Sequence, residues 1–151
     1  TYGLDGIITR SCNNYGPHQY HEKLIPVVVT KALNNEPIPV YGDGSNMREW
    51  IYVDDNCRGI MAALLNGKSK QIYNLGSGIE KTNLDLVREI LFHMDKPPTL
   101  IEMVEDRKGH DFRYFLDSED SYNQLSWEIE TDFSDGIKNT IEYYISKGAC
   151  K

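Results

Sequence analysis

A cluster of small polar side chains follows the first apolar run of the chain, and it is the strongest chemical signal in the sequence. Residues 11–14 read Ser-Cys-Asn-Asn, separated by two residues from the apolar pair Ile7 and Ile8, and a Gly-Pro turn at Gly16 and Pro17 ends the cluster. In an open α/β sheet, ligands bind at the carboxyl ends of the strands. Two adjacent amides can each donate and accept hydrogen bonds there. The cluster therefore predicts recognition of a polyhydroxylated ligand.

Two cationic residues, Lys23 and Arg48, stand where a bound anion would explain them. Lys23 lies in the first turn of an expected helix, where a positive charge opposes the helix dipole. Arg48 follows the turn of residues 42–45, and its forked donors match a pair of phosphate oxygens. Tyr41, just before that turn, can present a flat face to a base. The alternative is that Arg48 covers surface and Tyr41 belongs only to a tight turn.

The most charged segment is residues 106–114, which reads Asp-Arg-Lys-Gly-His-Asp-Phe-Arg-Tyr. A charge run of this kind is usually a solvated loop. Gly109, however, lets the segment turn sharply, and His110 and Tyr114 place two hydrogen-bonding rings among the charges. Long polar loops between strands are often functional. The sequence thus favours a binding loop, with a plain solvated loop as the alternative.

Several other chemistries find no support in the pattern. His18, His21 and His93 lack the spacing of a metal site. The sequence Gly76-Ser77-Gly78 follows an expected strand without the third glycine of a dinucleotide fingerprint. No phosphate loop and no nucleophile elbow is present. We interpret Asp54-Asp55 as the N-cap of a helix and not as an acid–base pair.

The elements that must position these residues alternate between strands and helices. Short apolar runs predict strands over residues 6–10, 39–41, 50–53, 71–75, 100–104 and 114–116. Helical spacing of apolar residues predicts helices over residues 22–34, 57–65, 82–94 and 134–145. The second of these helices has Ile60, Met61 and Leu64 on one face, and Thr82-Asn83 provides a cap for the third. This alternation predicts an α/β fold.

Composition excludes several classes of partner. The net charge of −7 argues against generic binding of nucleic acid, and no apolar run is long enough for a membrane span. Cys12, Cys57 and Cys150 form no CxxC pair, so neither zinc nor a disulfide framework is expected. A reducing, cytoplasmic setting follows as an expectation. Gly3 resembles the residue that ends a helix, which predicts a missing preceding element, the alternative being a complete small domain.

In chain order, these segments resemble the extended short-chain dehydrogenase/reductases that act on nucleotide sugars. The sequences at 13–17 (NNYGP), 48–55 (REWIYVDD) and 73–78 (YNLGSG) are similar to those of many epimerases and dehydratases in this family. The sequences at 22–26 (EKLIP) and 106–114 resemble more narrowly those of the dTDP-glucose 4,6-dehydratases. The resemblance covers the chain nearly end to end. One departure is Lys108, where the family usually carries proline.

The resemblance implies a role for each matching residue. Pro39, Val40 and Tyr41 would hold the thymine, and Arg48 and Arg107 would clamp the diphosphate. The implied contacts to a dTDP-sugar are Asn13, Lys23, Leu24, Pro39, Val40, Tyr41, Arg48, Asn83, Arg107, His110 and Tyr114. Cys12 and Asn14 would contact the cofactor NAD, and no metal is implied.

The resemblance also implies an activity for a longer parent protein. That enzyme oxidises C4 of a nucleotide-bound glucose with NAD, eliminates water across C5 and C6, and returns the hydride to C6. In the family, the glycine-rich cofactor loop and the catalytic residues precede the position of Thr1. Residues 1–151 would then form one unit, the last Rossmann strands interleaved with the smaller α/β substrate-binding domain. We expect this unit alone to be inactive, and the full-length protein to be a homodimer.

Three alternatives stay open from the sequence. The first is a sister enzyme on the same scaffold, such as another nucleotide-sugar epimerase, dehydratase or decarboxylase. The second is a non-catalytic module that binds a nucleotide sugar. The third is a chain that is unstable alone, because a partial parallel sheet has an unpaired edge.

Overall fold

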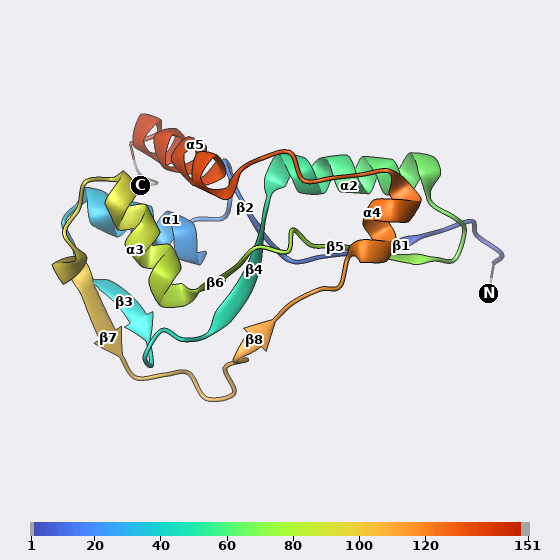
Figure 1. The fold of residues 1–151 in the computed structure, drawn as a ribbon. Coiled ribbons are helices and arrows are strands. Elements are labelled where there is room, and N and C mark those ends of the chain that lie inside the picture. The colour runs from blue at the N-terminus through green and yellow to red at the C-terminus, as the bar shows by residue number, and fades with distance from the viewer. Residues whose placement is uncertain (1, 149–151) are drawn as a thin grey trace.

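Strand β4 (Met47–Tyr52) runs through the middle of the molecule and connects its two lobes (Figure 1). The computed structural model describes residues 2–148. The second half of β4 pairs in parallel with β2 (Asn13–Tyr15), and its first half pairs antiparallel with β6 (Glu80–Thr82). The short strand β8 (Arg113–Tyr114) pairs in parallel with the start of β4. Because the partners come from distant parts of the sequence, β4 fixes their relative positions.

The first lobe is built on the parallel pair of β1 (Ile8–Ser11) and β5 (Ile72–Leu75). Helices α2 (Val53–Asn66) and α4 (Glu119–Leu125) pack against this pair (Figure 1). Parallel strands need a long crossover connection, and this one passes through part of the second lobe before it returns along α2. The buried residues of this lobe are Cys12, Ile51, Ala63, Tyr73, Leu75, Leu125 and Trp127.

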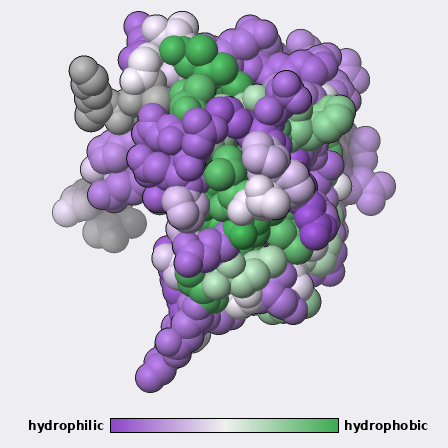
Figure 2. All heavy atoms as spheres, turned by 90° about the vertical axis from the view of Figure 1, so that its left-hand side faces the viewer, coloured by the Kyte–Doolittle hydropathy of each residue, from purple (hydrophilic) through white to green (hydrophobic). Residues whose placement is uncertain are grey.

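The second lobe contains a second parallel pair, β3 (Ile38–Tyr41) and β7 (Ile101–Val104), preceded at β7 by the 3₁₀ turn Pro98–Leu100. Its helices are α1 (Leu24–Leu33), α3 (Asn83–His93) and α5 (Phe133–Ser146), and they pack on one another. Their apolar faces form the larger core, which includes Ile25, Val28, Val29, Leu86, Val87, Ile90, Ile137 and Tyr144. Figure 2 shows this end of the molecule as a mainly hydrophilic surface with hydrophobic residues in its middle.

The predicted α/β class is confirmed, and so are the long periodic helices. Thr82 caps α3 as expected, because its hydroxyl accepts the backbone N–H of Asp85 at 3.0 Å. Four elements were not predicted, namely β2, β6, α4 and the 3₁₀ turn Pro98–Leu100. In addition, β4 begins at Met47 and not at Trp50, and β8 covers residues 113–114 and not 114–116. These elements are short, and the strands among them take their hydrogen bonds from distant partners, so local pattern does not mark them.

The N-cap prediction for Asp54-Asp55 is wrong. α2 begins at Val53, and its N-cap residue Tyr52 makes no side-chain cap hydrogen bond. Asp54 is exposed in the first turn, whereas Asp55 is fully buried. The Asp55 carboxylate accepts the backbone N–H groups of Glu130 at 2.9 Å and Thr131 at 3.2 Å, and it pairs with Arg58. The two acids therefore differ, because one is solvated and the other ties α2 to the segment before α5.

The apolar face expected for α2 is exposed. Ile60, Met61 and Leu64 are 44%, 54% and 71% exposed. The buried residues of α2 are instead Asp55, Asn56, Gly59 and Ala63. A Cβ atom at Gly59 would lie 2.9 Å from the Trp127 ring, so the helix approaches that indole closely through its small residues. Helical periodicity identified an apolar face correctly, but close packing buries the opposite one.

Two of the sequence expectations about cysteine and membranes can be compared with the described residues. Within residues 2–148, no helix is long and apolar enough to cross a membrane. Cys12 and Cys57 are both unpaired, and Cys150 lies outside the described residues. Burial raises the pKa of the Cys12 thiol to about 12. That thiol therefore stays protonated and unreactive at neutral pH.

Asp55 and its neighbour Asp54 provide a matched test of the tie between α2 and the segment before α5. We expect Asp55→Asn to lower the free energy of unfolding by about 2–3 kcal/mol, because one backbone donor and Arg58 lose a charged acceptor. Asp54→Asn should change it by less than about 0.5 kcal/mol. Urea unfolding followed by circular dichroism measures both. Equal effects of the two substitutions would contradict the tie.

Tyrosine burial predicts a loss of stability at alkaline pH. Burial raises the pKa of Tyr122 from its ordinary value of 10.0 to about 12, and its hydroxyl donates to the carbonyl of Gly76. Burial also raises the pKa of Tyr15. The stabilisation is complete below the unfolded-state pKa and is lost as pH rises toward the folded-state value. We expect Tyr122→Phe to reduce the loss of unfolding free energy above pH ~10, measured by urea unfolding; an unchanged pH profile would count against this assignment.

Candidate functional site

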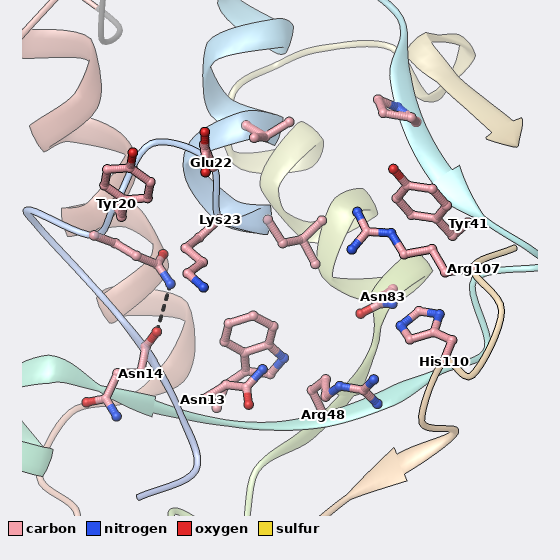
Figure 3. Close-up of a pocket in the computed structure, with 15 residues that line it drawn as sticks. Asn13, Asn14, Tyr20, Glu22, Lys23, Tyr41, Arg48, Asn83, Arg107 and His110 are labelled. Carbon is pink, nitrogen blue, oxygen red and sulfur yellow. Dashed lines mark hydrogen bonds between the residues drawn. The ribbon is translucent and has the colours of Figure 1, made fainter.

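A cavity of about 840 Å³ lies where the start of β2, the start of α1 with the loop before it, strand β3, strand β4, the start of α3 and the loop after β7 meet (Figure 3). This volume is in the range of small-molecule sites. The lining comes from six separate segments of the chain, so the two-lobed arrangement around β4 creates it. The lining residues are Asn13, Asn14, Gln19, Tyr20, Glu22, Lys23, Leu24, Val27, Pro39, Tyr41, Arg48, Trp50, Asn83, Arg107 and His110.

Side-chain alternation on β4 determines which residues face the cavity. Successive side chains of a strand point to opposite faces, so Arg48 and Trp50 line the cavity while Glu49 lies on the other side, fully buried. The same rule operates on β3, where Pro39 and Tyr41 line the cavity and Val40 packs into the core of the second lobe. One wall of the cavity therefore carries a guanidinium and an indole.

Three cations, Lys23, Arg48 and Arg107, surround the cavity without an acidic partner (Figure 3). Among residues 2–148, none of the three forms an ion pair. Nearby cations are paired, because Arg113 binds Glu80 at 2.7 Å and Lys81 binds Glu89 at 2.8 Å. The cavity thus keeps positive charge although the whole chain is acidic. Glu22 contributes a carboxylate to the same lining.

The Arg48 guanidinium is held in place by backbone carbonyls. It donates to the carbonyl oxygens of Met47 at 2.6 Å and Asp111 at 2.8 Å, with a longer contact to Phe112 at 3.4 Å. Carbonyl oxygens are neutral, so these bonds orient the group and leave its charge uncompensated. An oriented guanidinium with free charge is suited to a phosphate or carboxylate.

The loop after β7 is organised around Asp106. Its carboxylate accepts the backbone N–H of Arg107 at 2.8 Å, and it lies 2.9 Å from His110 Nδ1. The hydrogen bond with His110 is the main cause that lowers the pKa of Asp106 below its ordinary value. The Arg107 guanidinium lies over the Tyr41 ring, 4.1 Å from its centroid. Asp106 therefore orients both Arg107 and His110 toward the cavity.

Most residues that the resemblance assigned to the substrate do lie together. Those that line the cavity are Asn13, Lys23, Leu24, Pro39, Tyr41, Arg48, Asn83, Arg107 and His110, together with the cofactor candidate Asn14. Val40 is buried in the core, Cys12 is buried in the first lobe, and Tyr114 is 43% exposed on β8 outside the lining. For all of these residues, inside and outside the lining, ligand contact stays a prediction.

Sequence reasoning missed several lining residues, among them Gln19, Tyr20 and Trp50. The Gln19 side chain donates to the backbone carbonyl of Asn14 at 2.8 Å, and the backbone carbonyl of Gln19 accepts the Tyr144 hydroxyl at 2.5 Å. Trp50 could have been found from its two-residue spacing from Arg48 on the same strand. Gln19 carries no such signal, because it lies in an irregular loop next to His18, which has a φ of 65°.

The arrangement is suited to binding an anion that carries a flat ring and hydroxyl groups. Cations, amides and a tyrosine ring converge on one cavity. Within residues 2–148, no cluster of His, Cys, Asp and Glu that could hold a metal ion is found. The lining side chains therefore suit the cavity to recognition of a nucleotide-like ligand.

Comparison with known proteins agrees with this geometry. A model of the NAD dependent epimerase/dehydratase family matches residues 1–76. The low-salt glycan biosynthesis protein Agl12 of Haloferax volcanii is 48% identical over 145 residues, which cover 96% of this chain and 46% of that protein. The dTDP-glucose 4,6-dehydratase of an Actinoplanes species is 45% identical over 144 residues, covering 95% of this chain and 45% of that one. The chain spans about half the length of these curated relatives.

Solved structures show the same likeness. The dTDP-glucose 4,6-dehydratase DesIV of Streptomyces venezuelae, solved with NAD bound, superposes with a TM-score of 0.94 at 45% identity, covering 97% of this chain and 45% of that one. UDP-glucose 4-epimerase of Thermotoga maritima superposes with a TM-score of 0.88 at 28% identity, covering 97% and 48%. With the family match over residues 1–76, these likenesses show that the chain belongs to the NAD-dependent epimerase/dehydratase family.

Proposed function

We propose that this chain forms the nucleotide-sugar-binding part of a dTDP-glucose 4,6-dehydratase. The observation that carries the proposal is the convergence of Lys23, Arg48 and Arg107 on one cavity without any ion pair among residues 2–148. A diphosphate supplies the negative charge that these cations lack. We take glucose as the sugar and thymine as the base from the relatives, since several of them are dTDP-glucose 4,6-dehydratases.

The ligand contacts follow from the position of each side chain. Arg48 and Arg107 bind the diphosphate, and the ring of Tyr41 lies against the thymine beside Pro39. Asn13, whose amide both donates and accepts, and the ammonium of Lys23 contact the sugar hydroxyls. The remaining contacts expected from the resemblance are those of Leu24, Val40, Asn83, His110 and Tyr114.

The fit to NAD can be judged at two residues of this chain. The Nδ2 amide of the Asn14 side chain donates to the Cys12 carbonyl at 3.1 Å. The side-chain oxygen Oδ1 of Asn14 can therefore accept a hydrogen bond from a cofactor at the β2 end of the cavity. Cys12 is 5% exposed, its backbone N–H donates to the Leu75 carbonyl and its carbonyl accepts from Asn14, so nothing in its position adds support for a contact with NAD. NAD, when bound, supplies the hydride acceptor. We propose that the β1–β5 lobe is the end of the NAD-binding Rossmann unit and that residues 1–151 act as one unit.

Binding of dTDP tests this function directly. We expect the 151-residue chain to bind dTDP more tightly than thymidine, because only dTDP engages the cations. Arg48→Ala and Arg107→Ala should each weaken dTDP binding about tenfold, the loss of one charge-assisted contact, and leave thymidine binding nearly unchanged. Isothermal titration calorimetry measures all of these affinities.

Arg88 provides the matched control for that experiment, because it is an arginine on α3 that pairs with Asp85 and does not line the cavity. Arg88→Ala should leave dTDP affinity unchanged. UDP serves as the second ligand, and tighter binding of UDP than of dTDP would assign the chain to a sister enzyme. Equal binding of dTDP by wild type and Arg107→Ala would remove the diphosphate assignment.

The resemblance assigns no proton-transferring residue to this chain. We therefore expect the 151-residue chain, mixed with dTDP-glucose and NAD, to form no 4-keto-6-deoxy sugar. Nuclear magnetic resonance of the sugar detects that product, and the Streptomyces venezuelae dehydratase serves as a positive control. Turnover by this chain would show that residues within it carry the chemistry.

A further inference from the structure

Glu49 is a fully buried carboxylate that has no cationic partner. Its exposed fraction is 0%, and it forms no ion pair among residues 2–148. Burial of an unpaired charge is costly unless hydrogen bonds compensate it. Here the compensation comes from two backbone N–H groups: Oε1 accepts from Gly78 at 2.7 Å, and Oε2 accepts from Leu116 at 2.9 Å.

The two donors belong to segments that lie far apart in the sequence. Gly78 lies in the turn between β5 and β6, next to the first lobe. Leu116 lies in the segment of residues 105–118 that connects β7 to α4, which we name the strap. The strap carries Arg107 and His110 into the cavity. One carboxylate therefore connects the strap to the turn after β5.

Charged side chains hold the strap at its exposed part, because the Arg48 guanidinium donates to the Asp111 carbonyl at 2.8 Å and Arg113 pairs with Glu80 at 2.7 Å. Residues 105–115 of the strap are almost all exposed, and its only strand, β8, is 2 residues long. Neutral hydrogen bonds hold it at the N–H of Met47, which donates to Phe112 at 2.8 Å, and at the Asn74 side chain, which donates to Asp117 at 2.8 Å. Hydrogen bonds to a charged acceptor are roughly twice as strong as neutral ones. Of these charge-assisted contacts, the bond from Leu116 is the one made to a fully buried charged group, so it anchors the strap in the interior.

Close packing fixes the carboxylate itself. A Cβ atom at Gly76 would overlap Glu49 Oε1 and would lie 2.8 Å from Ser118 Oγ. The Gly76 N–H donates to that same Ser118 hydroxyl at 2.8 Å. The absence of a side chain at Gly76 therefore lets the strap and the Glu49 carboxylate come together at this point.

We propose that Glu49 is a positioning residue of the ligand site. By holding the Leu116 amide, it fixes the strap so that Arg107 and His110 face Lys23 and Arg48 across the cavity. Glu49 lies on the opposite face of β4 from Arg48 and contacts no ligand. The consequence for dTDP affinity rests on the proposed function, whereas the anchoring of the strap does not.

Glu49→Gln tests the proposal with little change of shape. An amide has one acceptor oxygen, so it satisfies one backbone N–H and turns a donor toward the other. We expect dTDP binding to weaken roughly tenfold, the effect of one lost charge-assisted bond. In an Arg107→Ala background, Glu49→Gln should cause little further loss, because its effect passes through the strap. In a Lys23→Ala background, the full tenfold loss should remain, since Lys23 lies on α1's side of the cavity. Additive losses in both backgrounds would overturn the proposal.

Hydrogen exchange of the ligand-free chain gives a readout that does not depend on dTDP. Amides of residues 112–118 should exchange at least several-fold faster in Glu49→Gln than in wild type. Thr140→Val is the control for general destabilisation, because it removes a buried bond from the Thr140 hydroxyl to Gly136 in α5, away from the strap. This control should leave both dTDP affinity and strap exchange relative to the rest of the chain unchanged.

Measuring both dTDP affinity and hydrogen exchange distinguishes failure of the proposed function from failure of the positioning role of Glu49. Absence of dTDP binding by wild type would remove the proposed function, and faster strap exchange in Glu49→Gln would still support the anchor. Unchanged strap exchange in Glu49→Gln, or the same change in Thr140→Val, would remove the positioning role whatever the chain binds.

Discussion

The alternation of side chains along β4 is the constraint on which the rest of the structure depends. Arg48 and Trp50 face the cavity, while Glu49 and Ile51 face the interior on the other side. A shift of one residue in the register of β4 would exchange these faces. Arg48 would then be buried and Glu49 would point into the anion site. The same pairing with β2, β6 and β8 therefore specifies both the fold and the ligand chemistry.

Two buried carboxylates, Glu49 and Asp55, also fix the position of segments in the last third of the chain. Both accept backbone N–H groups from irregular segments, Leu116 for Glu49 and residues 130–131 for Asp55. Irregular segments cannot satisfy their own amides through regular hydrogen bonding. A charged acceptor inside the protein both satisfies these amides and fixes where the segments run. The path of the chain from β7 to α5 thus depends on residues near β4 more than on its own local preferences.

Physical reasons separate what the sequence could predict from what it could not. Helices α1, α3 and α5 have strong apolar periodicity, and they were predicted; β2, β6 and α4 are short, and they were not. For α2, the apolar face was visible, but the small residues Gly59 and Ala63 permit closer packing and are buried instead. In the site, the alternation of side chains along β3 could have predicted that Val40 packs in the core, because its neighbours Pro39 and Tyr41 face the ligand.

The contact between Arg107 and Tyr41 has a consequence for the proposed binding of a nucleotide. The Arg107 guanidinium lies 4.1 Å from the centroid of the Tyr41 ring. A cation–π contact at an exposed site contributes about 0.5–1 kcal/mol, whereas a hydrogen bond to a charged group contributes about 1.5–3 kcal/mol. Under the proposed function, a diphosphate therefore interacts with Arg107 more strongly than the Tyr41 ring does, and where it moves Arg107 off the ring, that face of Tyr41 becomes available to a base. Binding of the two parts of a nucleotide would then be coupled through one side chain, because the diphosphate frees the surface on which the base stacks.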